Sequence, residues 1–280
     1  MRDMLPPTNA VVEILNACTN SIQNQELAGR LTAALGHFSA LEVDYRDRAL
    51  ASLLYTLPVE RITGGITQAE MSWLYTAVFA RLNGPTRHIY DAIKLAAPGL
   101  ICPLCNQRTV GTLDHHMSKQ SYPGFAVTPL NLVPACKDCN TDTGARAVTT
   151  AAEQTFHPYF DHIDDEIWLH AVVEESSPPV IRFEARPPQT WEPSKRSKVE
   201  NHFHTFKLGV LYSVHAGAEL QNIEDDVLRL AQKEGPNGLK EEFTHRASGR
   251  RKKVRNNWQA AMYSALANSD WFCQEGYLLI

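Results

Sequence analysis

The sequence predicts an α+β fold, in which a mainly helical chain carries a small module of two strands and a helix near its centre and a β-hairpin after that module. Apolar residues recur at helical spacing before residue 97 and again after residue 193, two Cys-x-x-Cys pairs enclose a short polar segment, and two apolar runs of strand length follow. We therefore divide the 280 residues into a helical N-terminal region (1–97), a central module (98–160) and a region (161–280) in which the hairpin precedes further helices.

The N-terminal region shows a clear helix start and a clear helix stop. Thr67 followed by Glu70 forms a capping box before an apolar run, and Asn-Gly-Pro at 83–85 ends that run. A further short helix is expected over 86–96. The pattern assigns no chemistry to this region, which could support the central module or bind a partner protein.

The cysteines of the central module fall into two pairs, Cys102 with Cys105 and Cys136 with Cys139. Zinc prefers four thiolate or imidazole ligands in a tetrahedron, and two such pairs supply four thiolates. Buried unligated thiols or disulfides are the alternative, but nothing in the sequence suggests an oxidising compartment. We predict a structural Zn²⁺ that holds together a segment too small and polar to bury a core of its own.

The polar residues between and beside these cysteines have a chemical logic. Thr112–His116 and Asn131–Val133 are predicted as two short strands, and a helix is expected after Cys139. This arrangement would bring together Asp114, His115, Asn131 and Asn140. A neutral imidazole can take a proton from water, Asp and Asn oxygens suit a hard divalent cation, and an Asn side chain can orient the imidazole.

With these residues in these positions, the segment from Cys102 to Gly144 resembles the HNH (ββα-metal) endonucleases, in particular their zinc-stabilised subset. The resemblance implies that His115 activates water, that Asn131 supports His115 and its loop, and that Asp114 and Asn140 bind a catalytic Mg²⁺ or Mn²⁺. The implied reaction is hydrolysis of DNA phosphodiester bonds with one metal ion, leaving 5′-phosphate and 3′-hydroxyl ends.

The segment departs from the family pattern at two points. Ser118 stands where many members carry proline. The double histidine also permits a second register, as in colicin-type nuclease toxins, in which His115 would bind the metal and His116 would be the base. We favour His115 as the base because the Asp-His pair then gives the metal a carboxylate from Asp114.

The last region is predicted to begin with a hairpin, because runs 166–175 and 180–186 flank Ser-Ser-Pro-Pro. Helices are expected from residue 193, including shorter ones over 223–233 and 238–246. The net charge is −4, so DNA binding requires a local basic surface. We predict that this surface is the run of Arg246, Arg250, Arg251, Lys252, Lys253 and Arg255. A solvated helix start or a protein-contact surface is the alternative.

The sequence contains no apolar run of membrane-spanning length and no apolar stretch of the signal-peptide kind, so we expect a cytoplasmic protein without a membrane partner. DNA is the expected partner. Analogy at the level of the fold adds a regulatory or ATPase protein partner, a homo-oligomer and a role as an effector in prokaryotic restriction or phage defence. The alternative function is a zinc-stabilised nucleic-acid-binding or adaptor subunit without catalysis.

Overall fold

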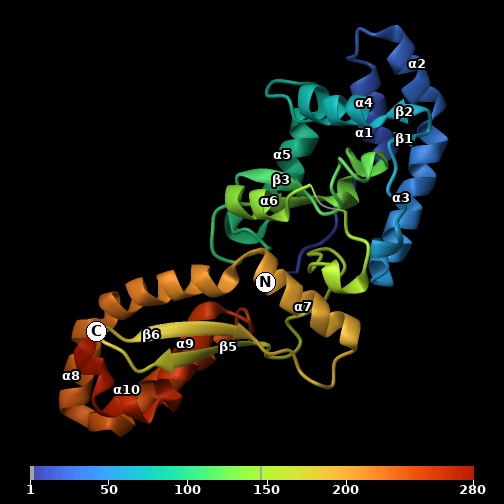
Figure 1. Cartoon of the computed structure of the whole chain (residues 1–280). Coiled ribbons are helices and arrows are strands. Elements are labelled where there is room, and N and C mark those ends of the chain that lie inside the picture. Colours follow the sequence, from blue (N-terminus) through green and yellow to red (C-terminus); the bar gives the residue numbers. More distant parts are fainter. Residues whose placement is uncertain (1–2, 146) are drawn as a thin grey trace. The chain divides into compact units, whose positions relative to one another are not determined.

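The computed structural model describes residues 3–145 and 147–280, which form two compact units, residues 3–162 and residues 163–280 (Figure 1). The described residues combine helices with short strands, and those strands form three two-stranded antiparallel sheets. The predicted α+β class, with a cluster of four cysteines, is confirmed at this level.

Helices make up most of the first unit before its central strands. Their apolar faces share one core cluster, to which α1 contributes Ile14, α3 contributes Phe38, and the central strands contribute Leu113 and Leu132. The central strands therefore rest on the core of the helices. The elements are α1 (Val11–Thr19), α2 (Gln25–Ala33), α3 (Leu35–Leu50), β1 (Ile62–Thr63), β2 (Ile66–Thr67), α4 (Gln68–Trp73) and α5 (Arg87–Leu95).

The predicted capping box opens α4. The Thr67 hydroxyl accepts a hydrogen bond from the Glu70 N–H, and the Glu70 carboxylate accepts one from the Thr67 N–H at 2.9 Å. The helix continues as a π-helical segment, Leu74–Phe79, in which the Ala80 N–H donates to the Tyr75 carbonyl at 2.8 Å. Such segments are rare and often lie at functional sites, and this one carries Tyr75, which contacts the central strands.

The central elements follow the predicted order of strand, strand and helix. Strand β3 (Thr112–His115) pairs antiparallel with β4 (Leu132–Ala135), and α6 (Lys137–Thr143) follows. The helix begins before Cys139 rather than after it, because Cys136 is its N-cap and the Cys136 sulfur accepts a hydrogen bond from the Cys139 N–H at 3.4 Å. A sulfur therefore takes the place of the oxygen that usually caps a helix.

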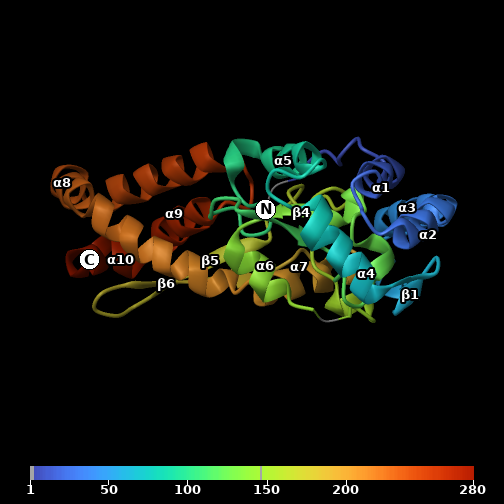
Figure 2. The ribbon, with the colours of Figure 1, turned by 90° about the horizontal axis from the view of Figure 1, so that it is seen from above.

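The second unit opens with the predicted hairpin, β5 (Leu169–Glu174) paired with β6 (Val180–Ala185). The helices are α7 (Pro193–Thr205), α8 (Leu208–Arg251), α9 (Trp258–Asn268) and α10 (Asp270–Gln274). The predicted break between helices over 223–233 and 238–246 is confirmed, because the backbone of α8 is not helical at Gly235, but the two helical parts are longer than predicted and run from Leu208 to Arg251. The helix bends at Gly235, whose φ is +68°, next to Pro236, which has no N–H to donate (Figure 2).

The two arms of α8 have different roles in this unit. The first arm packs on β6, where the Ser213 hydroxyl donates to the Ile181 carbonyl at 2.7 Å. The second arm packs on α9, where the rings of Phe243 and Tyr263 stack with centroids 6.0 Å apart. Helix α9 in turn packs on β5. Among the described residues, no helix has the length and apolar character needed to cross a membrane.

Candidate metal centre and adjoining polar site

The four predicted zinc ligands converge on one point of the first unit. Cys102, Cys105, Cys136 and Cys139 are all buried, and their Sγ atoms lie within 4.8 Å of one another. Four sulfurs about 2.3 Å from a tetrahedral zinc would be about 3.8 Å apart, and the Sγ atoms of Cys105 and Cys136 are 4.0 Å apart. The four thiols could therefore bind a metal such as zinc, with no ligand position left for water.

Backbone geometry and a nearby cation support this cluster. The Arg108 N–H donates to the Cys105 sulfur at 3.4 Å, matching the contact at Cys136 in the other pair. The Arg108 guanidinium pairs with Asp138 of α6 at 2.9 Å. Burial opposes the charge of Arg108, but Asp138 and three of the thiols outweigh it, so the pKa of Arg108 is raised. This ion pair ties the first cysteine turn to the start of α6.

Asp114 lies on β3 and faces α6. The Thr143 hydroxyl donates a 2.7 Å hydrogen bond to Asp114 Oδ2. Thr143 and Asn140 are three residues apart on α6 and so lie on one face of the helix. Burial raises the pKa of the Asp114 carboxyl to about 7, although the Thr143 bond opposes the rise. Asn140 therefore lies on the face of α6 that meets Asp114, and the divalent-cation site at this strand–helix contact stays a prediction.

His115 is buried on the opposite face of β3. One ring nitrogen, Nε2, lies 2.8 Å from the Ala126 carbonyl, and the ring centroid is 4.3 Å from that of Tyr75. A carbonyl only accepts, so this nitrogen must carry the proton and the other nitrogen keeps a lone pair. Burial, followed by the charge of Lys119, lowers the pKa of His115 to about 3, which keeps the ring neutral.

His116, the alternative base, is less buried and lies beside another histidine. Its ring centroid is 4.1 Å from that of His157, a buried residue near the end of the central module. The backbone N–H of His116 donates to the Asn131 carbonyl at 3.0 Å, which extends the pairing of β3 and β4 by one residue. The structure therefore separates the adjacent histidines, with Tyr75 beside His115 and His157 beside His116.

Asn131 holds the loop between β3 and β4. Its side-chain amide donates to the carbonyls of Met117 and Phe125 at 2.9 and 3.1 Å, and its Oδ1 accepts from the Met117 N–H at 2.7 Å. Oδ1 also accepts from the Tyr45 hydroxyl of α3 at 3.1 Å. This fully buried, fully bonded amide positions the loop and does not touch the His115 ring through any hydrogen bond that the structure records.

Lys119 and Tyr75 extend the candidate site beyond the predicted residues. The Lys119 ammonium lies 5.0 Å from the centroid of the Tyr75 ring. Its charge acts on both Asp114 and His115, and its own pKa is lowered, chiefly by burial. Tyr75 contacts the His115 ring and Tyr45 contacts Asn131, although helical periodicity alone gives no sign that these tyrosines reach a site formed by later strands.

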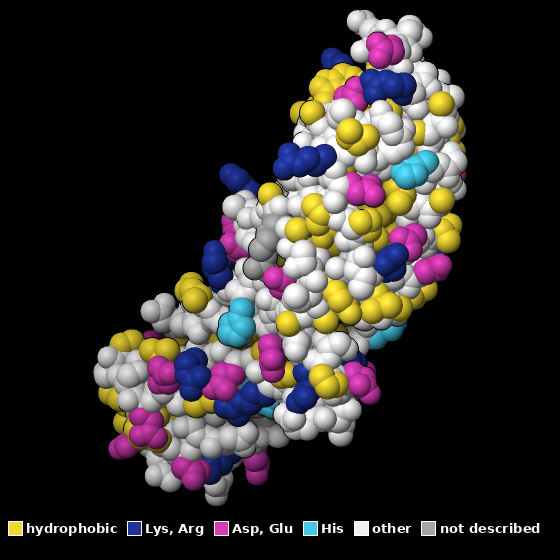
Figure 3. All heavy atoms as spheres, turned by 45° about the vertical axis from the view of Figure 1, so that its right-hand side comes forward, with side chains coloured by type: hydrophobic (Ala, Val, Ile, Leu, Met, Phe, Trp, Pro, Cys, Tyr) yellow, Lys and Arg dark blue, Asp and Glu magenta, His cyan; other side chains and the backbone are white. Residues whose placement is uncertain are grey.

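The predicted basic run divides into two sets. Arg246 pairs with Glu242 at 2.7 Å, and both Arg246 and Arg250 lie over the Tyr263 ring. The remaining cations are set apart from this contact, since Arg251, Lys252 and Arg255 line a hollow and Lys253 is exposed. On the face drawn in Figure 3, Lys and Arg side chains are dispersed among Asp and Glu side chains.

Comparison with known proteins adds one full-length similarity. The chain is 26% identical over 296 residues to Protein ea31 of Escherichia phage lambda, covering 97% of this chain and 99% of that protein. The similarity therefore runs through both compact units and is not confined to the cysteine-rich segment. No family model matches the chain, and no solved structure matches it.

Proposed function

We propose that the chain is a metal-dependent endonuclease of the HNH (ββα-metal) kind that hydrolyses DNA phosphodiester bonds. Asp114 and Asn140 would hold Mg²⁺ or Mn²⁺, and the four cysteines would hold a structural Zn²⁺. The observation that carries the proposal is the 2.7 Å bond between Thr143 and Asp114. It brings the carboxylate of β3 to the helical face that also bears Asn140, immediately after a four-cysteine cluster.

One feature of His115 supports it as the residue that takes a proton from water. The Ala126 carbonyl fixes one nitrogen as a donor, so the other nitrogen has its lone pair available. Asp114 is adjacent in sequence, although regular strand alternation directs the two side chains to opposite faces of β3. His116 is therefore the competing candidate, since it is more exposed and follows Asp114 at the spacing of one strand face.

The remaining residues would prepare the site for a phosphodiester. Asn131 would fix the loop, and Lys119 would place a positive charge near the reacting phosphate. A divalent cation bound by Asp114 and Asn140 would stabilise the negative charge that develops on the phosphate during hydrolysis. The exposed Lys252, Lys253 and Arg255 would add salt-dependent affinity for DNA. A regulatory protein partner and a role in restriction or phage defence remain part of this proposal by analogy.

A plasmid assay tests the proposal directly. Supercoiled plasmid is incubated with the full chain and Mg²⁺ or Mn²⁺, and wild type is compared with Asn140→Ala. We expect nicking or linearisation by wild type and a loss of about a hundredfold or more in the variant, because an amide ligand of the ion is removed. The matched control is Thr141→Ala, the next and exposed position of α6, which should cleave like wild type.

Zinc content and melting temperature are measured for all three proteins. An inactive wild type that is folded and loaded with zinc would favour the alternative function, a zinc-stabilised nucleic-acid-binding or adaptor subunit. Equal cleavage activity of wild type and Asn140→Ala would show that Asn140 is not a ligand of the catalytic cation. A reduced melting temperature of Asn140→Ala would assign its loss of activity to folding.

A further inference from the structure

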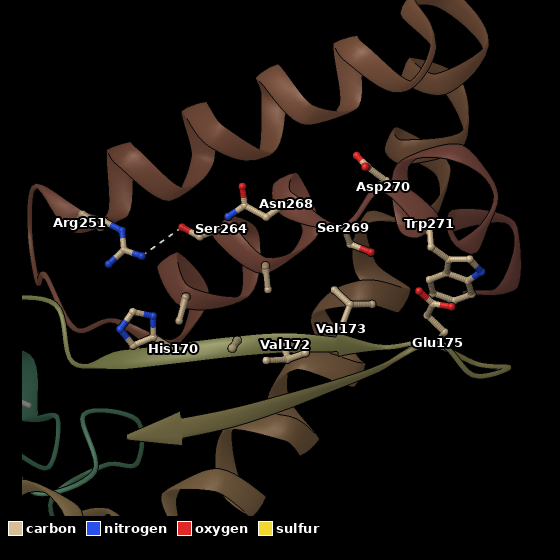
Figure 4. Close-up of a pocket in the computed structure, with 13 residues that line it drawn as sticks. His170, Val172, Val173, Glu175, Arg251, Ser264, Asn268, Ser269, Asp270 and Trp271 are labelled. Carbon is tan, nitrogen blue, oxygen red and sulfur yellow. Dashed lines mark hydrogen bonds between the residues drawn. The ribbon is translucent and has the colours of Figure 1, made fainter. Parts of the chain in front are cut away.

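The second unit contains a pocket of about 430 Å³ between β5, α9, α10 and the end of α8 (Figure 4). Its walls combine small apolar side chains of β5 and α9 with a few polar groups. This volume lies in the range of small-molecule sites, which are typically apolar with a small number of placed polar groups. The residues used below are His170, Glu175, Arg251, Ser264, Asn268 and Trp271, all of which line the pocket.

Arg251 lines this pocket together with two carboxylates, Glu175 and Asp270, of which Asp270 pairs with Lys240. The Arg251 guanidinium donates to the Ser264 hydroxyl at 3.1 Å and to the Arg255 carbonyl at 3.2 Å. Both partners are neutral, and among the described residues no carboxylate forms an ion pair with it. Arg246 and Arg250 of the same helix differ, since carboxylates of Glu242 and Glu219 lie 2.7 and 3.8 Å from them. A half-buried guanidinium without a carboxylate is suited to an anionic ligand.

The two ends of the pocket differ in character. Figure 4 shows Arg251 and His170 toward one end and Glu175 and Trp271 toward the other, with Asn268 between them. Burial, then the charges of Arg186 and Arg251, lowers the pKa of His170, while Glu184 and the Ile167 backbone oppose the shift. One end therefore offers cationic and hydrogen-bonding groups, and the other offers an aromatic surface beside an acceptor.

We propose that this pocket binds a small phosphorylated ligand that carries an aromatic base, of which a nucleoside 5′-monophosphate is the simplest member. The phosphate would bind Arg251, Ser264 and His170, because a guanidinium matches phosphate oxygens in geometry and charge. The base would lie against Trp271, and Glu175 or Asn268 would accept hydrogen bonds from its amino group. Glu175 disfavours a long polyanion running through the whole pocket, which favours this ligand over a nucleic-acid backbone.

A second hollow of about 520 Å³ adjoins the first, and Arg251, Ser264 and Asn268 line both. Its other walls include Lys252, Arg255 and Ser248. Further phosphates attached to the first would therefore meet more cations on that side of Arg251. This continuity extends the ligand class from monophosphates to nucleotides with more than one phosphate.

The test is calorimetric titration of the full chain with AMP, GMP, CMP and dTMP in turn, and with inorganic phosphate. We expect at least one nucleotide to bind, and Arg251→Gln to weaken that binding about tenfold or more. Lys233→Gln is the matched control, because it removes the same charge from an exposed position of α8 that lines neither hollow, and it should stay within about twofold of wild type.

Two further variants show whether a loss of affinity reflects the pocket itself or a folding defect of Arg251→Gln. His170→Gln should weaken the same nucleotide, and Trp271→Phe should weaken the nucleotide but leave inorganic phosphate unaffected. Equal affinity for phosphate and nucleotide would overturn the base-recognition part of the proposal. Absence of binding by all the nucleotides would overturn it entirely, as would loss of oligonucleotide binding in Arg251→Gln without any mononucleotide affinity, which would assign Arg251 to a nucleic-acid surface.

Discussion

The Tyr45 hydroxyl of helix α3 lies 3.1 Å from Asn131 Oδ1 and joins the N-terminal helices to the loop between β3 and β4. The same hydroxyl lies 3.1 Å from His157 Nε2, while His157 Nδ1 accepts the Tyr159 N–H at 3.3 Å. Nδ1 therefore has no proton, so Nε2 donates to Tyr45 and Tyr45 donates to Asn131. Three segments far apart in sequence are thus connected by hydrogen bonds whose directions are all determined.

Tyr45→Phe should lower the free energy of unfolding of the first unit by about 1–3 kcal/mol, because it removes the buried hydroxyl that is bonded to both His157 and Asn131. Urea denaturation followed by far-ultraviolet circular dichroism measures the change. Tyr55→Phe is the control, since the Tyr55 hydroxyl has no recorded hydrogen bond among the described residues, and it should be nearly neutral. Equal stability of both variants would show that the Tyr45 bond is dispensable.

His115 and His116 are the two candidates for the general base, and each assignment predicts a different result of mutation. His115→Gln should reduce plasmid cleavage by about a hundredfold or more, the usual contribution of a general base, while His116→Ala should retain most activity. Glutamine is chosen because His115 is buried and the glutamine amide can still donate to the Ala126 carbonyl from the position of the imidazole Nε2. Zinc content and melting temperature should match wild type. Activity that survives in His115→Gln and disappears in His116→Ala would show that His116 is the base.

If the four cysteines bind zinc, removing one of them should cost the first unit both its zinc and its local fold. Cys139→Ser should reduce bound zinc and expose the segment around β3 and α6 to protease, because metal binding supplies much of the folding free energy of so small a module. Cys273→Ser is the control, a buried thiol of the second unit whose sulfur donates to the Leu266 carbonyl. It should keep its zinc, as measured by atomic emission, even if it is less stable. Full zinc content in Cys139→Ser would contradict the four-thiolate site.

Sequence could predict the central elements because their signals are local. The spacing of the cysteines and the polar positions of Asp114 and Asn131 all lie within one segment, so the order of strand, strand and helix follows from neighbouring residues. Helix α6 begins before Cys139, earlier than predicted, because the Cys136 sulfur caps it. Cysteine is not among the residues that usually cap helices, so the sequence did not indicate this start.

The rest of the site depends on tertiary packing that no local pattern encodes. Tyr45 and Tyr75 have the spacing of core residues in helices, and only the folded chain brings them to Asn131 and His115. The sequence could have predicted that the basic run from Arg246 to Arg255 divides into paired and unpaired cations. Glu242, Arg246 and Arg250 recur every four residues, which predicts one helical face on which charges pair, whereas Arg251 falls on another face.

Lys119 should contribute to cleavage through its charge. Lys119→Ala is expected to lower the rate of plasmid cleavage by about tenfold to a hundredfold, because a cation whose charge acts on both Asp114 and His115 would also attract the phosphate. Lys119→Arg should retain much of the cleavage activity, because it keeps the positive charge. If Lys119 only packed its aliphatic stem on Tyr75, keeping the charge would not be needed for activity. Lys137→Ala, an exposed lysine at the start of α6, removes the same charge from the same module and serves as the control. If Lys119→Ala and Lys137→Ala lose equal activity, and added salt abolishes the difference from wild type in both, Lys119 contributes only to general attraction of DNA.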